Sequence, residues 1–465
     1  MSCKRARGRR QGSRAGSDVG ASIAVAALAV AVAGACLLVD TRAESAFDAP
    51  KRLVPLLGIA VAVVALLVLH GPARGSGWSW RTGTTEQRLA LALTAGALAI
   101  AVVSAIVSPR RVTSLASTRT LWLFALLLPL GASRALDGGR PFIVIGAFVG
   151  ACAVNASVSL LQFFGGLRLF SVEAVGGRLD VSAFVGNDGV LALSLALACL
   201  ICLAAVVWAR SPAIRLAGGG GIVLHLAALA VNQSLTALTA LAAGSVVLVA
   251  MSLRRRSVIG ALAVGLVLAT GVMLHPTLSR RAQSTLELVR AGDWDAALTY
   301  RSGPWAAALE MTRARPLVGW GPGTFAAEFV PHRLQAELRF QRRFVNPFLA
   351  GSYTEAHSEY LQAAAEGGTP AGLAALAAMG ALIVGLVRVI RRAPDGPSRR
   401  EAIVLLALLC AGAVSALTWF PLQRDHRRSA PAGRRARVDT VDPLRGAPRL
   451  GRGATSVRGA WGARG

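Results

Sequence analysis

The sequence predicts an all-α protein, a polytopic bundle of transmembrane helices with one large extracytoplasmic loop that contains short helices. Hydrophobic residues make up 54% of the 465 residues and charged residues only 16%, against about 25% in a soluble domain. The apolar residues form about eleven runs of roughly the 17–25 residues that a helix needs to cross a bilayer. This composition excludes a disordered chain, a fibrous chain and a small disulfide scaffold.

The predicted spans are separated by short connections along most of the chain. They cover residues 21–39, 53–70, 89–107, 120–136, 141–164, 188–209, 216–232, 235–252, 257–275, 370–390 and 402–421. Residues 1–20 are strongly basic and precede a run of full spanning length, so we predict an uncleaved first span with a cytoplasmic N-terminus. Residues 21–275 then hold spans one to nine, 276–369 a large outer loop, and 370–421 spans ten and eleven.

The net charge of +27 comes almost entirely from arginine, since the chain has only two lysines, Lys4 and Lys51. The arginines gather at the ends of apolar runs and in both termini. This is the positive-inside pattern of membrane proteins, not the binding face of a nucleic-acid-binding protein. Arg110 and Arg111 are the main exception, because the count of spans places them on the outer side. We therefore predict membrane lipids as partners and no nucleic acid.

The outer loop, 276–369, is nearly neutral, with ten arginines against nine acidic residues. One short helix is predicted to begin at 302–305 and to stop before Pro316. A second is predicted from about residue 356 to the glycines at 367–368, with a glycine-rich turn at 319–323 between the two. His357 is predicted in the first turn of the second helix. The positive end of a helix disfavours the imidazolium form, and a neutral imidazole can accept a proton.

Three blocks of this sequence resemble a known family. They are the stretch from Arg301 through Pro316-Leu317-Val318-Gly319-Trp320-Gly321-Pro322-Gly323-Thr324-Phe325, the stretch from Ala356-His357-Ser358-Glu359-Tyr360-Leu361 to Glu366-Gly367-Gly368, and Arg178 with Phe184-Val185-Gly186-Asn187-Asp188. Together they resemble the O-antigen ligase and O-antigen polymerase family of bacterial membrane glycosyltransferases. The resemblance covers roughly residues 175–425.

The resemblance implies an inverting, metal-independent glycosyltransferase that needs no cofactor. It implies a polyprenyl-pyrophosphate-linked glycan as donor and lipid A core, another glycan or a protein as acceptor. The family has about twelve spans in the bacterial inner membrane, with the large loop in the periplasm between spans nine and ten. By position in the motifs, His357 is the catalytic base and Arg301 a catalytic cation on the pyrophosphate. The implied substrate-binding residues are Arg178, Asn187, Glu359, Tyr360, Glu366 and Trp305.

The chain departs from the family pattern in three places, of which the mildest is Asn187-Asp188 in place of Asn-Pro-Asn. Leu235 stands where many members have an arginine, so we expect a phosphate-binding cation to be missing or supplied from elsewhere. Residues 424–465 form a tail with eleven arginines, three aspartates and no apolar periodicity, where the family pattern calls for a twelfth span. This tail is either basic and disordered or the product of a changed reading frame. The second case would make the chain a truncated, inactive family member.

Several residues have a second interpretation. Glu359, Tyr360 and Glu366 could serve helix packing and capping, and Trp305 could anchor the protein at the membrane interface. Asp293-Trp294-Asp295 imitates a metal-binding Asp-x-Asp, although the spacing is common and we predict no metal site. The alternative function is a transporter or flippase of lipid-linked sugars. Such proteins place ionisable residues within their spans, and these predicted spans contain almost none.

Overall fold

The structure is a computed structural model that describes residues 2–40, 48–69, 85–131, 140–167, 173–174, 178–179, 181–252, 271, 274–344 and 353–418. The helices are α1 (Ser2–Leu37), α2 (Asp48–Leu69), α3 (Thr85–Val107), α4 (Arg111–Gly131), α5 (Pro141–Phe164), α6 (Asp188–Trp208), α7 (Pro212–Asn232), α8 (Leu235–Ser252), α10 (Pro276–Arg290), α11 (Trp294–Ala297), α12 (Ser302–Ala314), α13 (Phe325–Phe340), α14 (Glu359–Arg392) and α15 (Pro397–Thr418). Strands β1 (Glu173–Ala174) and β2 (Arg178–Leu179) pair as a short antiparallel hairpin.

The all-α membrane architecture predicted from the sequence is confirmed. In the described part of the chain, nine helices are long and apolar enough to cross a membrane, namely α1, α2, α3, α5, α6, α7, α8, α14 and α15. A helix pairs all of its backbone amides and carbonyls internally, which is what a bilayer core requires. The bounds of α5 and α8 are the same as the predicted spans. The predicted span 257–275 lies almost entirely outside the described residues, and the basic tail 424–465 lies wholly outside them.

Helix α4 differs from the predicted span at 120–136. It begins nine residues earlier, at Arg111, and it is not among the nine helices apolar enough to span. Its first turns carry small polar side chains, including Ser114 and Ser117, which lie against the glycines of the outer loop. A Cβ added to Gly321 would collide with Ser114, and one added to Gly323 with Ser117. The polar half of α4 is therefore used for this tertiary contact.

Helix α14 has a kink that separates an outer segment from a membrane-spanning segment. Gly368 has φ 79° and ψ 168°, which is not helical, and the helix continues on both sides of it. Residues 359–367 form a short helix within the outer layer. Residues 370–390 match the predicted tenth span. Glycine is suited to this position because a residue with a Cβ rarely adopts such a positive φ.

The spanning helices approach one another closely at small residues. In the contact between α1 and α2, a Cβ added to Gly58 would lie 2.5 Å from the Cβ of Ala31. In the bundle of α6, α8 and α15, a Cβ added to Gly244 would lie 2.5 Å from Leu200. Van der Waals packing at small residues is the usual driving force of helix association in lipid, where burial of apolar surface gives little. These contacts fix the scaffold that carries the outer layer.

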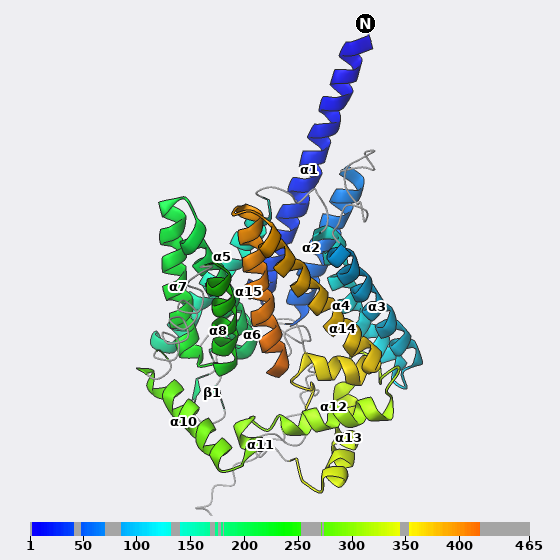
Figure 1. Cartoon of the computed structure of the whole chain (residues 1–465), viewed down its shortest axis with the longest axis vertical. Helices are drawn as coiled ribbons and strands as arrows, with labels where there is room; N and C mark the ends of the chain where they lie inside the picture. The colour runs from blue at the N-terminus through cyan, green and yellow to red at the C-terminus, as the bar shows by residue number, and fades with distance from the viewer. Residues whose placement is uncertain are drawn as a thin grey trace, which may run out of the picture. The chain divides into compact units, whose positions relative to one another are not determined.

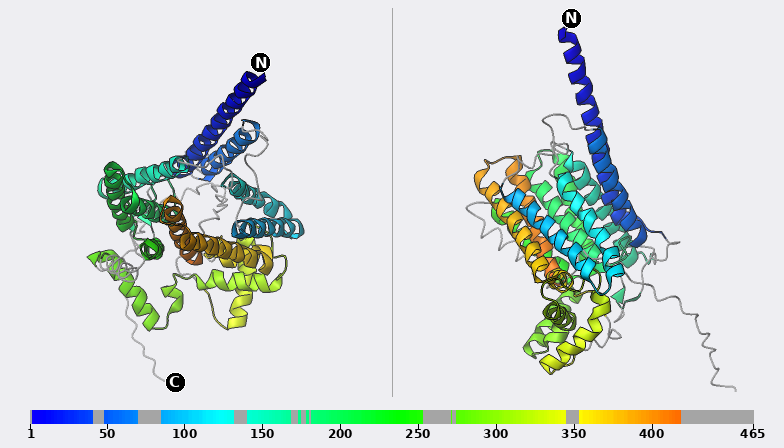
Figure 2. Two further views of the ribbon diagram at one scale, coloured as in Figure 1. Left: turned by 45° about the horizontal axis from the view of Figure 1, so that its top comes forward. Right: turned by 90° about the vertical axis from the view of Figure 1, so that its right-hand side faces the viewer.

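The outer layer consists of α10 to α13 and the start of α14. Figures 1 and 2 show α12 and α13 beyond one end of the spanning helices, beside the start of α14. The first short helix predicted in this loop is confirmed as α12. Helices α10 and α13 were not predicted. The core of this layer contains Ala307, Ala308 and Met311 of α12, Phe325 and Phe329 of α13, and Tyr353, Ala356 and Ala365.

Candidate functional site

The turn before α12 holds Arg301 in a half-buried position. Thr299 and Tyr300 both have left-handed backbone conformations, with φ values of 54° and 60°, and Arg301 follows as the residue before the first helical position. Two successive non-glycine residues in this conformation are strained and persist only where the surrounding structure holds them. Burial lowers the pKa of the Arg301 guanidinium, and the neighbouring Tyr353 acts in the opposite direction. A guanidinium remains charged even so, which makes Arg301 a half-buried cation.

His357 lies directly before α14 and not in its first turn, so that part of the sequence prediction is wrong. Ser358 is the N-cap residue and Glu359 the first helical residue. His357 itself has φ 53°, a left-handed conformation, which turns the chain sharply into the helix. The residue is half-buried, and its ring meets the ring of Tyr353 edge to face, with centroids 5.4 Å apart.

Tyr353 and Trp305 connect His357 with the Arg301 turn. The Tyr353 hydroxyl donates to the Tyr300 carbonyl at 3.0 Å, one residue before Arg301. Trp305 lies one turn into α12 from Arg301, and its indole N–H donates to the carbonyl oxygen of His357 at 3.4 Å. The segments of two predicted catalytic residues, more than fifty positions apart in sequence, are thereby connected through the same pair of aromatic side chains. Tyr353 was not singled out in the sequence, because no local pattern marks it.

Gln362 and Glu366 form a buried network behind His357. The Gln362 side-chain carbonyl accepts from the backbone N–H of Ala356 at 3.0 Å, and its amide donates to Glu366 Oε1 at 3.2 Å. The same Glu366 oxygen accepts from the backbone N–H of Phe325 at 3.1 Å. Burial raises the pKa of the Glu366 carboxyl to about 7, although hydrogen bonds from backbone N–H groups and from Gln362 act to lower it. Glu366 therefore joins the start of α13 to the segment that carries His357.

The glycine-rich turn at 319–323 forms hydrogen bonds with the C-terminal end of the short helix 359–367. The backbone N–H groups of Trp320 and Gly321 donate to the carbonyls of Ala365 and Glu366 at 3.1 Å and 2.7 Å. Gly319 has φ 63°, and an added Cβ would collide with the backbone at Glu366 and Gly368. The free carbonyls at this helix end are thus satisfied by a second segment, as helix ends require.

The connection between α3 and α4 supports the same turn from the membrane side. Ser104 donates to the carbonyl of Glu366 at 2.7 Å, and Ser108 donates to the carbonyl of Trp320 at 2.5 Å. Arg110 forms an ion pair with Glu328 of α13, with 2.7 Å between Nε and Oε1. The exception that Arg110 makes to the positive-inside pattern thus has a structural reason, because this cation neutralises an acid of the outer layer.

The other predicted substrate-binding residues make contacts with different parts of the protein. The side chain of Asn187 caps α6, accepting from the N–H of Val190 at 2.9 Å. Tyr360 donates to the carbonyl of Ala413 in α15 at 3.2 Å, and Glu359 is buried at the start of α14. Arg178 lies in β2, and its side chain is outside the described part of the chain.

The side chains of Asp293 and Asp295 have different partners. Asp293 caps α11 by accepting from the N–H of Ala296 at 3.1 Å. Asp295 accepts from the Ser302 hydroxyl and pairs with Arg342. Among the described residues, no group of three or more histidine, cysteine, aspartate or glutamate side chains is placed to hold a metal ion.

Two cations outside the predicted set contact segments of the family motifs. The ammonium of Lys51, at the start of α2, is buried and donates to the carbonyls of Phe184 and Val185, the latter at 2.7 Å. Arg281 of α10 donates to the carbonyl of Gln233 at 2.6 Å, in the turn that leads to Leu235. The one sequence signal for Lys51 is its type, since it is one of two lysines in an arginine-rich chain.

Comparison with known families supports the resemblance seen in the sequence. Residues 220–376 match the sequence model of the family described as O-antigen ligase. This match runs from α7 into the spanning part of α14 and includes Arg301, His357 and the glycine-rich turn. No curated protein matches the chain. The family match supports, in broad terms, a membrane glycosyltransferase of the O-antigen ligase or polymerase type.

Proposed function

We propose that this protein transfers a glycan from a polyprenyl-pyrophosphate carrier to an acceptor hydroxyl, as its match to the O-antigen ligase family suggests, with His357 as general base. The observation that carries the proposal is that Tyr353 and Trp305 connect His357 with the turn that holds the half-buried cation Arg301. A base and a fixed cation at one place are what the reaction needs. The base serves the acceptor, and the cation serves the departing pyrophosphate.

In the proposed step, His357 removes the proton from the acceptor hydroxyl while that oxygen attacks the anomeric carbon of the donor sugar. The bond between the anomeric carbon and the pyrophosphate oxygen breaks, and both bonding electrons leave with the pyrophosphate. The configuration at the anomeric carbon is inverted. Arg301 stabilises the negative charge that develops on the leaving group, and a guanidinium suits paired contacts to phosphate oxygens. Arg178 is the second candidate cation, from β2.

No metal ion is part of this proposal. A pyrophosphate is a good leaving group, so its departure calls for positive charge and not for a strong acid. We propose that the acceptor is lipid A core, another lipid-linked glycan or a protein, and that the reaction takes place on the periplasmic side of the bacterial inner membrane. On this proposal the outer layer of α10 to α13 faces the periplasm, where the donor is presented.

The direct test uses the purified full chain in detergent with a polyprenyl-pyrophosphate-linked glycan and an acceptor. His357→Gln should lower turnover by about 10²–10⁴-fold, the usual contribution of a general base. Arg301→Gln should lower it by about tenfold or more, the loss expected for a charge-assisted contact. The matched controls are His275→Asn, which keeps a helix-capping side chain, and Arg313→Gln, on an exposed position of α12. Both controls should retain turnover.

The alternative function, transport of lipid-linked sugars, makes the opposite prediction. A transporter should tolerate His357→Gln, because His357 is outside the spanning helices. Full activity of this variant, in a protein that inserts and melts like the parent, would refute the assignment of the base.

A gel of surface polysaccharide from a strain that lacks the gene separates ligase from polymerase. Loss of all chains from lipid A core, with long lipid-linked chains accumulating, indicates a ligase. Core that bears a single repeat indicates a polymerase. Failure of the restored gene to correct an altered pattern would favour the truncated, inactive alternative.

A further inference from the structure

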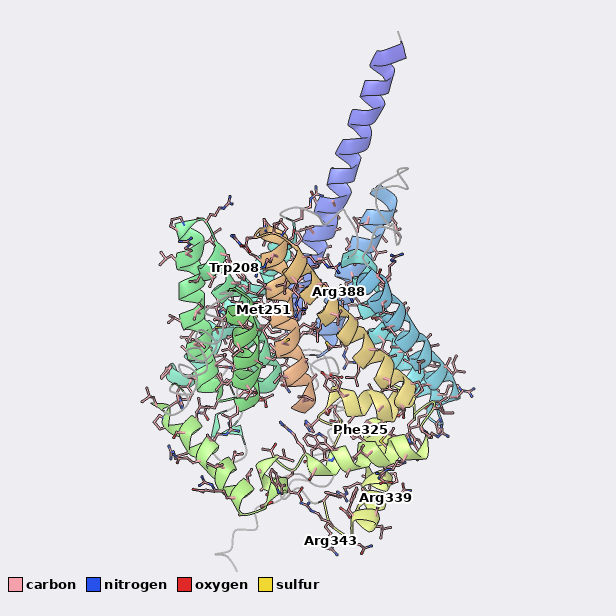
Figure 3. The ribbon with its side chains drawn as sticks, viewed as in Figure 1. Trp208, Met251, Phe325, Arg339, Arg343 and Arg388 are labelled. Atoms are coloured by element: carbon pink, nitrogen blue, oxygen red, sulfur yellow. The ribbon has the colours of Figure 1, made fainter. Side chains whose placement is uncertain are left out.

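A polar cavity lies at the opposite end of the helices from the outer layer. It has a volume of about 270 Å³ between the ends of α6 and α8 and the turn from α14 to α15. Its lining includes Trp208, Ser252, Asp395, Arg399, Arg400 and Ile403. Figure 3 shows Trp208, Met251 and Arg388 together in this region, far from Phe325 and Arg339 of the outer layer. The cavity therefore has no part in the site described above.

Arg399 is already used to hold this end of the bundle together. Its guanidinium donates to the carbonyls of Ile390 and Met251, each at 3.1 Å, and pairs with Asp395 at 2.7 Å. It thus connects α8, α14 and α15, and the charge of Asp395 is offset within the lining. Arg399 has little capacity left for a ligand.

Arg400 is the cation that remains in the cavity. It is half-buried, and its guanidinium forms no hydrogen bond or ion pair with any of the described residues. Positive charge dominates this end of the bundle. Residues 208–215 and 388–403 contain seven arginines but only two acidic residues, Asp395 and Glu401. A half-buried guanidinium in such a field is suited to a bidentate contact with a phosphate group.

The other lining groups match a lipid headgroup. Trp208 ends α6, and tryptophan is enriched at the level of lipid headgroups, where its ring contacts apolar chains and its N–H reaches polar groups. Ile403 supplies apolar surface, whereas the Ser252 hydroxyl already donates to the carbonyl of Leu248. Helix α15 also begins beside this cavity, and the positive end of a helix favours an anion. Basic pockets between spanning helices are known binding sites for anionic lipid headgroups.

We propose that this cavity binds the phosphate group of an anionic membrane phospholipid, with Arg400 as the ligand to the phosphate oxygens and Trp208 beside the headgroup. The lipid source is favoured over a soluble phosphate because the cavity opens among helix ends at the membrane surface. This inference concerns the end of the bundle remote from His357. It does not depend on the proposed transfer reaction.

The test measures thermal unfolding of the purified full chain in nanodiscs of phosphatidylcholine with increasing amounts of phosphatidylglycerol. A ligand that binds only the folded state raises the melting temperature once its concentration passes the dissociation constant, and the rise then grows with the logarithm of the concentration. The parent should show this rise as phosphatidylglycerol is added. Arg400→Gln should need about tenfold more phosphatidylglycerol, as expected for the loss of a charge-assisted contact. Arg391→Gln, an exposed arginine on the same surface, should respond like the parent.

Two results would overturn the proposal. One is an equal response of Arg400→Gln and Arg391→Gln, which would mean that phosphatidylglycerol acts through general surface charge. The other is an equal rise in the parent with inorganic phosphate in pure phosphatidylcholine, which would exclude the lipid as the ligand. If Arg400→Gln fails to fold in phosphatidylcholine, Arg400→Lys replaces it. This variant keeps the charge but loses the paired geometry, so it should also bind more weakly than the parent.

Discussion

Gly319→Ala tests whether the glycine-rich turn supports the segment that carries His357. Gly319 has φ 63°, and alanine in this left-handed conformation costs about 1–2 kcal/mol. The new Cβ would also lie 2.5 Å from the backbone nitrogen of Gly368 and closer still to the carbonyl group of Glu366. These are backbone atoms at a kink, so they cannot move aside as the end of a flexible side chain can.

The collision adds about 1–3 kcal/mol, the usual cost of inserting a carbon into a well-packed site. The total loss of unfolding free energy is therefore about 2–5 kcal/mol. Because the unfolding entropy grows with chain length, 465 residues give about 1 °C per kcal/mol, and the melting temperature should fall by roughly 2–5 °C. Transfer activity should fall as well, because the short helix 359–367 has to shift and His357 precedes it directly.

The assay is thermal unfolding in detergent together with glycan transfer below the melting temperature. The matched control is Gly380→Ala, in the spanning part of α14, where an added Cβ would meet no atom within 4 Å. Alanine there should leave stability unchanged or raise it by up to about 1 kcal/mol, the difference in helix propensity. If Gly319→Ala melts within about 1 °C of Gly380→Ala and transfers glycan at the same rate, the reasoning is wrong.

Three further predictions concern the same region. Gln362→Leu leaves the N–H of Ala356 unpaired and should cost about 1–3 kcal/mol of unfolding free energy by thermal melting, with reduced turnover. Glu366 has a pKa raised to about 7, so the folded state holds its proton where the unfolded state has lost it, and stability should fall as pH rises from about 4.5 to 7. Glu366→Gln should remove that dependence in melts taken across this pH window, and an unchanged slope would contradict the assignment. Arg110→Gln should lower the free energy of unfolding by less than about 1 kcal/mol in the same melting assay, because the Arg110 side chain that pairs with Glu328 is 48% exposed. A larger loss would mean that this ion pair fixes the outer layer on α3 and α4.

The membrane architecture could be predicted from the order of residues alone. Residues 141–164 and 235–252 were predicted as spans and form helices with the same bounds, α5 and α8. This is possible because a bilayer imposes a local rule, in which enough consecutive apolar residues must form a helix whatever their neighbours are. The blocks around Arg301 and His357 also carried the family resemblance, since they are local patterns. Helix α12 was predicted for the same reason.

Features that depend on contacts between distant segments were not predictable. The start of α4 at Arg111 depends on Ser114 and Ser117 lying against the glycines of the outer loop, which no property of α4 reveals. Helix α13 contains Pro331 and few regular apolar positions, and its core face is defined by α12. The capping role of Asn187 could be inferred from its type, but the choice between capping and binding could not.

The candidate site shows most clearly which features the sequence determined and which needed the tertiary structure. The sequence named His357 and Arg301 as residue types suited to proton removal and phosphate binding. Tertiary contacts were needed to show that His357 precedes its helix in a left-handed conformation, and that Tyr353 and Trp305 attach it to the Arg301 turn. A left-handed non-glycine residue is held in place by its surroundings and is not preferred by its own side chain. The chemistry of each side chain follows from the order of residues. The geometry of a site depends on packing between distant segments that come together only when the chain folds.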